Sequence, residues 1–190
     1  MLVLASTSRY RRELLSRLQL DFSVAAPDVD ETPLPGESPS QTALRLALAK
    51  AEAVAKAYPA ALVIGADQVA ECDGLRLDKP GTHERAAAQL SMLSGHRAVF
   101  HTAIVLLHAP SRRLHTRLVP VTVSFRTFGA GEIESYLRKE QPYDCAGSAK
   151  SEGLGIALIA SMDCPDPTAL IGLPLIALVS MLEAEGVRVV

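Results

Sequence analysis

The sequence predicts one α/β domain, built around a mixed, twisted sheet with flanking helices. Short apolar runs alternate along the chain with segments whose apolar residues recur at helical spacing, which is typical of this class. The chain has 190 residues, of which 48% are hydrophobic. That is enough to bury one sizeable core. No internal repeat or low-complexity linker divides it, so we expect a single domain over residues 1–190.

The first half of the chain predicts strand, helix, loop, helix and strand in that order. An apolar run at 2–5 precedes a hydroxyl-rich turn, and three leucines at helical spacing predict a helix over 10–18. Four prolines and a glycine predict a loop over 26–39. Ser38 and Pro39 are a helix-start signal, and an Ala/Leu-rich helix should run to about residue 57. The next strand, 62–64, is expected to end at Gly65–Gln68.

The second half continues the alternation. A hairpin-like stretch through residues 73–74 and a turn at 78–81 come first. Helices are predicted over 82–93, 131–139 and 174–185. Strands are predicted over 98–107 and 114–125, joined around Pro110, and over 156–160. The polar, glycine-rich segment 144–155 is expected to be a loop.

Charge and cysteine usage exclude several classes of protein. The formal net charge of −2 disfavours a nucleic-acid binder, which normally carries a basic excess. No apolar run is long enough to span a membrane, and the short apolar start precedes its arginines, the reverse of a signal peptide. Three widely spaced cysteines predict free thiols in a reducing cytoplasm. The five histidines are scattered, which argues against a histidine-based metal site.

The turn after the first strand could bind phosphate. It offers Ser6 and Ser8, followed by Arg9 and Arg11. Backbone N–H groups at a helix start attract anions, and arginine adds bidentate donors. Ordinary helix caps and exposed arginines would give the same pattern.

Several charged residues further along could act on such a group. Asp67 is expected just beyond a buried strand, where a carboxylate can hold a cation or accept a proton from water. An aspartate that only hydrogen-bonds its own backbone in a turn would explain the residue equally well. Asp30 and Glu31 lie in an acidic loop that could bind Mg²⁺. A solvated acidic loop without a metal would have the same composition. Lys79, in a rigid turn, can place a charge on phosphate; Lys50 is harder to interpret, because helix lysines are usually solvated.

The combination is more informative than any single residue. Metal-assisted attack of water on a polyphosphate needs several cations and several carboxylates, and this chain supplies both. The P-loop, GxSxG and kinase signatures are missing from the sequence.

These segments resemble the Maf family of nucleoside triphosphate pyrophosphatases along essentially the whole chain. Residues 4–12 resemble the N-terminal signature, 29–31 the acidic motif and 65–69 the motif of the catalytic aspartate. Lys79-Pro80, Leu93-Ser94-Gly95, Ala146-Gly147 and Gly172-Leu173-Pro174 follow in the family's order. The resemblance implies a Maf/ITPase-like fold with a nucleotide-binding cleft.

Three residues make the chain similar to the branch that acts on 7-methyl-GTP rather than dTTP or UTP. They are Tyr10, Gln68 and Glu152, the last replacing a family glutamine. One carboxylate can accept both Watson–Crick-edge donors of guanine, and a methylated, cationic base favours stacking on an aromatic ring. The chain departs from the family at Arg9, where a proline is usual.

The resemblance implies a cytoplasmic house-cleaning hydrolase that converts 7-methyl-GTP to 7-methyl-GMP and pyrophosphate. Asp67 would activate water, and Glu31, with Asp30 second, would bind Mg²⁺ or Mn²⁺. The phosphate chain would be held by five residues: Ser6, Ser8, Arg11, Lys50 and Lys79. Tyr10, Gln68 and Glu152 would select the base.

The implied partners are a nucleotide and, as in many family members, a second copy of the chain, with no nucleic acid and no membrane. Two alternatives stay open. One is a pyrophosphatase for dTTP, UTP or another nucleotide. The other is a nucleotide-binding regulator of cell division with little catalysis.

Overall fold

The computed structural model describes all 190 residues and contains a mixed sheet of seven strands with flanking helices, which confirms the predicted fold class. The sheet order is β2-β1-β3-β5-β6-β7, with β4 paired to β3. The strands are β1 Leu2–Ala5, β2 Phe22–Ala25, β3 Leu62–Cys72, β4 Leu75–Leu77, β5 Arg97–His108, β6 Arg113–Phe125 and β7 Ile159–Asp163. The α-helices are α1 Arg9–Ser16, α2 Pro39–Ala55, α3 His83–Leu93, α4 Ala130–Glu140 and α5 Leu175–Ala184, and the 3₁₀ helices are η1 Ala146–Ser148 and η2 Leu154–Leu158.

The chain forms two compact units. Unit 1 comprises residues 1–68, 102–119 and 166–190, and unit 2 comprises 69–101 and 120–165. The long strands β3, β5 and β6 each contribute residues to both units.

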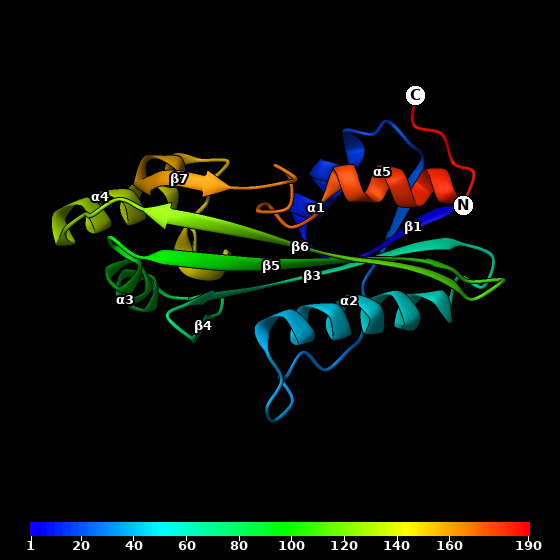
Figure 1. Cartoon of the computed structure of the whole chain (residues 1–190), viewed down its shortest axis with the longest axis horizontal. Helices are drawn as coiled ribbons and strands as arrows, with labels where there is room; N and C mark the ends of the chain where they lie inside the picture. The colour runs from blue at the N-terminus through cyan, green and yellow to red at the C-terminus, as the bar shows by residue number, and fades with distance from the viewer. The chain divides into compact units, whose positions relative to one another are not determined.

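Unit 1 is built on three parallel strands. β1 pairs with β2 on one side and with β3 on the other, so that Leu2 faces both Phe22 and Leu62. α1 connects β1 to β2, and α2 leads back to β3 across β1. α1 and α5 lie on one face of these strands and α2 on the other (Figure 1). The chain therefore reverses its winding direction at β1, and such switch points are where α/β proteins bind ligands.

The main core of unit 1 lies between the sheet and the pair α1 and α5. Leucines of both helices pack there against alternate residues of the strands. The fully enclosed members include Leu4, Leu15, Ile64, Leu106 and Leu178. Successive residues of a strand point to opposite faces, so the odd-numbered residues of β3 point toward α2.

Unit 2 contains the far end of β3, where β4 pairs antiparallel and Ala70 faces Leu77. β7 pairs antiparallel with β6, so that Thr122 faces Asp163. α3 and α4 pack against each other, and η1 packs on α3.

The structure differs from the sequence predictions in three places. β2 was missed, because two of its four residues are exposed, the other two are only half-buried, and one is a serine. β3 does not end near Gly65 but continues to Cys72, since β4 pairs with its far end. The strand predicted over 156–160 begins only at 159 and runs to 163, because residues 154–158 form η2.

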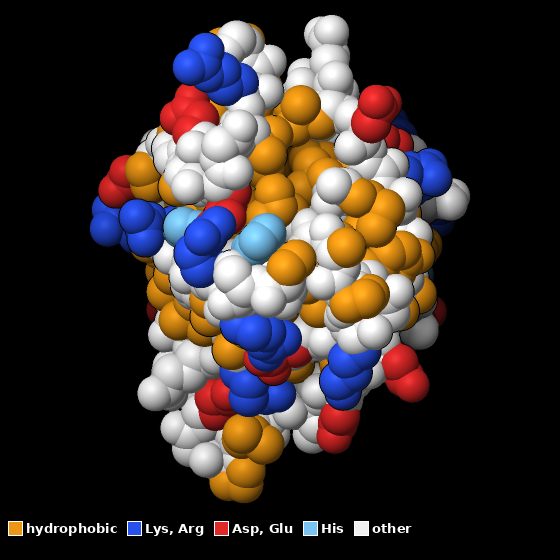
Figure 2. All heavy atoms as spheres, turned by 90° about the vertical axis from the view of Figure 1, so that its right-hand side faces the viewer, with side chains coloured by type: hydrophobic (Ala, Val, Ile, Leu, Met, Phe, Trp, Pro, Cys, Tyr) orange, Lys and Arg blue, Asp and Glu red, His pale blue; other side chains and the backbone are white.

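None of the helices combines the length and apolar character needed to cross a membrane. Acidic and basic side chains are interspersed on the face drawn in Figure 2, in keeping with the net charge of −2.

Candidate functional site

Both serines of the turn between β1 and α1 accept hydrogen bonds from backbone amides. Ser8 is the N-cap of α1, and its Oγ accepts a hydrogen bond of 3.4 Å from the Arg11 amide. The Oγ of buried Ser6 accepts one of 3.1 Å from the Ser8 amide. In these bonds both hydroxyls accept, so each still has a proton to donate. The capping role and the predicted phosphate-binding role are therefore compatible.

Asp67 lies within β3, not beyond its end as predicted, and points toward α2. Its Oδ1 is 2.6 Å from the Nζ of Lys50, and the same Nζ is 2.7 Å from Oε1 of Glu31. The Lys50 and Asp67 side chains are 6% and 9% exposed, whereas the Glu31 side chain is 61% exposed. One buried ammonium thus joins two carboxylates, one enclosed and one facing solvent.

The burial of Lys50 follows from its position on α2. It occupies the core-facing stripe of the helix together with Ala43, Ala47 and Val54. Small residues let the helix approach the sheet closely: a Cβ built on Gly65 would lie 2.1 Å from the carbonyl oxygen of Ala47. This close packing brings the Lys50 ammonium to the Asp67 carboxylate.

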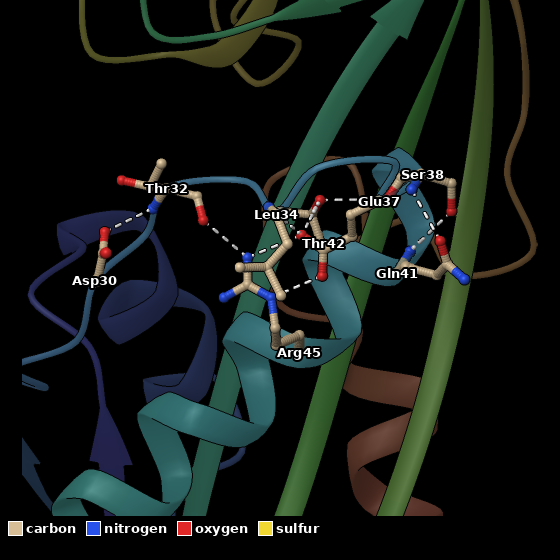
Figure 3. Close-up of polar contacts among 8 residues, drawn as sticks. All are labelled: Asp30, Thr32, Leu34, Glu37, Ser38, Gln41, Thr42 and Arg45. Atoms are coloured by element: carbon tan, nitrogen blue, oxygen red, sulfur yellow. Dashed lines mark hydrogen bonds and ion pairs between the residues drawn. The ribbon is translucent and has the colours of Figure 1, made fainter.

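A clamp of Glu37 and Arg45 fastens the acidic loop to α2 (Figure 3). The Arg45 guanidinium donates to both Glu37 carboxylate oxygens at 2.6 and 2.9 Å, and to the carbonyl of Thr32 at 3.0 Å. Glu37 also accepts from the Leu34 amide and the Thr42 hydroxyl. The bond from Arg45, with these others, lowers the pKa of Glu37 to about 2.

Sequence reasoning missed this clamp. The signal that could have found it is a glutamate just before the helix start and an arginine two turns later, a spacing that brings both to one side of α2.

The two acidic candidates of the loop differ in their contacts. Asp30 accepts a bond of 2.9 Å from the Thr32 amide, closing a tight turn. Hydrogen bonding from Thr32, by its side chain first and by its amide second, lowers the pKa of Asp30. Glu31 is the one that contacts Lys50. Glu31 is thus joined to the charged cluster through Lys50.

Arg11 belongs to the same cluster. Its Nε donates to the carbonyl of Gly172 at 2.9 Å. Burial lowers the pKa of the Arg11 guanidinium, while the charges of Asp67 and Glu31 oppose that shift. The structure therefore brings Arg11, Lys50, Glu31 and Asp67 together in unit 1.

Gln68 points to the opposite face of β3 from Asp67, as strand geometry requires. Its amide nitrogen lies 2.9 Å from Oγ1 of Thr102 and 3.0 Å from the carbonyls of Ala169 and Leu170. Gln68 thus anchors the segment that leads to Gly172, the partner of Arg11.

The guanidinium of Arg9 stacks on the ring of Tyr10. The Arg9 guanidinium carbon is 4.7 Å from the ring centroid, and its Nη2 donates to the Tyr10 hydroxyl at 2.6 Å. Arg9 is the position at which the chain departs from the Maf signature.

The other two predicted site residues, Lys79 and Glu152, belong to unit 2. Lys79 is exposed in the turn that follows β4, and Glu152 is exposed in the loop before η2. Glu140 fixes that loop on both sides of Glu152, since its carboxylate accepts from the Lys150 ammonium at 2.7 Å and from the Leu154 amide at 2.6 Å.

The cluster in unit 1 fits a hard divalent cation. Mg²⁺ prefers carboxylate oxygens. The Lys50 ammonium shows that one oxygen of Asp67 and one of Glu31 converge on a single positive charge. Glu31 and Asp67 are therefore the residues that would hold such an ion, with Asp30 nearby in the chain.

The arrangement is suited to metal-assisted attack of water on a polyphosphate. It offers a carboxylate that can accept a proton, cations that can neutralise phosphate, and oxygen ligands for a metal.

Comparison with known proteins agrees with this chemistry. The family model described as "Maf-like protein" matches residues 1–185. The chain is 63% identical to the "7-methyl-GTP pyrophosphatase" of a Polaromonas species over 98% of this chain and 85% of that protein. It is 58% identical to the protein of that name from Methylobacillus flagellatus, over 100% and 98% of the two chains. The Thiobacillus denitrificans protein of that name is 62% identical over 99% and 94%.

Proposed function

Because the chain belongs to the Maf family, whose relatives are nucleotide pyrophosphatases, we propose that it hydrolyses 7-methyl-GTP to 7-methyl-GMP and pyrophosphate. Relatives at 58–63% identity carry that activity in their names. The observation that carries the chemical part of the proposal is the buried Lys50 ammonium, shared by Asp67 and Glu31.

Asp67 is the base of the proposed reaction. One carboxylate oxygen contacts Lys50 at 2.6 Å, and the carboxylate has a second oxygen that can accept a proton from water. The water oxygen bonds to the α-phosphorus as Asp67 takes its proton. The bond between the α-phosphorus and the bridging oxygen then breaks, and pyrophosphate departs. A divalent cation held by Glu31 and Asp67, Mg²⁺ or Mn²⁺, would neutralise phosphate charge when bound.

The cationic residues bind the phosphate chain in this proposal. The Lys50 side chain is buried, and the partly buried Arg11 is held by its bond to the Gly172 carbonyl, so little conformational entropy is lost when phosphate arrives. The Ser6 and Ser8 hydroxyls donate to phosphate oxygens, and Lys79 adds a further positive charge.

Base selection is assigned to Glu152 and Tyr10. The Glu152 carboxylate would accept the two donors on the Watson–Crick edge of guanine. The Tyr10 ring would stack on the cationic base in place of the Arg9 guanidinium. Gln68 would complete base selection, with its amide nitrogen held by the carbonyls of Ala169 and Leu170.

The test is turnover of 7-methyl-GTP, GTP, dTTP and UTP with Mg²⁺, with pyrophosphate resolved from phosphate. We expect pyrophosphate mainly from 7-methyl-GTP. Asp67→Asn should lower turnover by about 10³-fold or more while the folded variant still binds the nucleotide.

Each alternative gives a different result. Release of pyrophosphate mainly from dTTP or UTP would keep Asp67 as base and overturn the base assignment. Nucleotide binding without turnover in the folded wild-type protein would favour a regulator.

A further inference from the structure

Unit 2 contains a second group of metal-binding side chains, formed by Cys72, Asp73 and His96. One ligand atom from each lies within 4.8 Å of the other two. The Asp73 Oδ2 is 2.7 Å from Nδ1 of His96 and 3.9 Å from Sγ of Cys72. Cys72 ends β3, Asp73 follows it, and His96 directly precedes β5.

Backbone geometry holds these side chains in place. Asp73 and Gly74 form the tight turn between β3 and β4, with φ values of 49° and 77°. Gly95 has a φ of 77°, and its amide donates to the carbonyl of Arg126 at 3.0 Å. The His96 amide donates to the carbonyl of Leu93. Two fixed turns thus present their side chains to the same point.

We propose that Cys72, Asp73 and His96 bind a transition-metal dication, with Zn²⁺ the best match. Sulfur, imidazole nitrogen and carboxylate oxygen are the three ligand types that Zn²⁺ accepts in tetrahedral sites. Mg²⁺ would avoid such a set, because it prefers oxygen alone. Three protein ligands leave the fourth position to water or a further group.

Burial and charge fit this assignment. Cys72 is 1% exposed, whereas the Asp73 and His96 side chains are 63% and 53% exposed, so the ion can enter from solvent while its sulfur ligand stays shielded. A thiolate and a carboxylate together balance the two charges of the ion. The exposed Asp73–His96 pair contributes little to stability by itself, so a metal can separate the two at small cost.

The test uses Co²⁺ as a spectroscopic substitute for Zn²⁺, in a Cys145→Ser/Cys164→Ser background in which Cys72 is the sole thiol. We expect a near-ultraviolet sulfur-to-cobalt charge-transfer band that saturates at one equivalent and is displaced by Zn²⁺. A catalytic ion held only by carboxylates gives no such band. The result is therefore independent of nucleotide turnover and of the function proposed above.

Variants assign the ligands. Cys72→Ser should remove the band, and the exposed changes Asp73→Asn and His96→Gln should each weaken cobalt binding at least tenfold without unfolding the protein. A missing band in the folded background protein, or a band unchanged by His96→Gln and Asp73→Asn, would overturn the proposal.

Discussion

The Lys50 ammonium lies 2.6 Å from the Asp67 carboxylate, and both side chains are almost excluded from solvent. The nearby Glu31 carboxylate shares the same ammonium. A buried charge is tolerated when it is paired, and removing one partner leaves the other uncompensated.

The first prediction concerns Lys50→Met, which keeps the unbranched apolar part of the side chain and removes the charged terminal nitrogen. Asp67 and Glu31 would then face each other without a cation, and we expect a loss of about 3–5 kcal/mol in the free energy of unfolding measured by urea with EDTA present. Turnover should fall by about 10²–10³-fold. Added Mg²⁺ should restore part of the stability. An equally stable variant in EDTA would contradict the pairing.

The second prediction concerns Gly65, where α2 comes closest to β3. In Gly65→Ala the new methyl group would meet the Ala47 carbonyl at 2.1 Å, so α2 must move away and carry Lys50 from Asp67. We expect a loss of about 3 kcal/mol or more, with reduced turnover. Gly131→Ala is the control: its methyl group would meet nothing within 4 Å, and it lies in a helix, where alanine is favourable. Equal stability of the two variants would refute the close approach.

Local signals in the sequence predicted most elements, and the limits of prediction lie where contacts are long-range. The cap at Ser8 and the strand before it follow from residues that are adjacent in the chain. The orientation of Gln68 depends on how far β3 continues, which the pairing with β4 determines. The burial of Lys50 depends on how closely α2 packs against the sheet. Neither the length of β3 nor this packing distance can be read from the short apolar run at 62–64. The core-facing position of this lysine was the available clue.

The third prediction tests the clamp between Glu37 and Arg45, which holds the loop that carries Glu31. Arg45→Gln removes the paired donors to Glu37 and the bond to Thr32. We expect Glu31 to become mobile, so that kcat/KM falls by roughly 10-fold, equivalent to about 1.4 kcal/mol, and more Mg²⁺ is needed for half-maximal activity. The control is Ser38→Ala, which removes the α2 cap next to the clamp at about 1 kcal/mol. A shift in Mg²⁺ requirement of the same size in both variants would mean that Arg45 acts only through helix stability.

The fourth prediction concerns the stacking of Arg9 on Tyr10. Arg9 is the first residue of α1, a position that accepts proline, so Arg9→Pro should free the ring without disturbing the helix. If the ring stacks on a cationic base, KM for 7-methyl-GTP should fall by about 2- to 30-fold relative to GTP, the range of a cation–π contact. Arg12→Ala, which removes a neighbouring exposed charge, should leave that ratio unchanged. A constant ratio in Arg9→Pro would remove Tyr10 from base selection.

The fifth prediction concerns Glu185, at the end of α5, whose side chain is 2% exposed. The Arg113 guanidinium donates to its two carboxylate oxygens at 3.1 and 2.6 Å, and His115 contacts it at 2.7 Å. The hydrogen bonds from Arg113 and, to a smaller extent, from His115 lower the pKa of Glu185 to about 2 from an ordinary value of 4.5. The folded protein therefore binds this proton more weakly than the unfolded chain does. The stabilisation is complete above about pH 4.5 and is lost as the pH falls toward 2.

The test of this fifth prediction is urea unfolding of wild type and Glu185→Gln between pH 7 and pH 2.5. We expect the variant to be less stable at pH 7 by about 1–2 kcal/mol, because a charged, bidentate interaction becomes a neutral one. The difference between the two proteins should shrink below pH 4.5, where wild type loses the same contribution. Glu183→Gln, an exposed change in the last turn of the same helix, should track wild type at every pH. A constant difference across the whole range would show that Glu185 acts through packing and not through its charge.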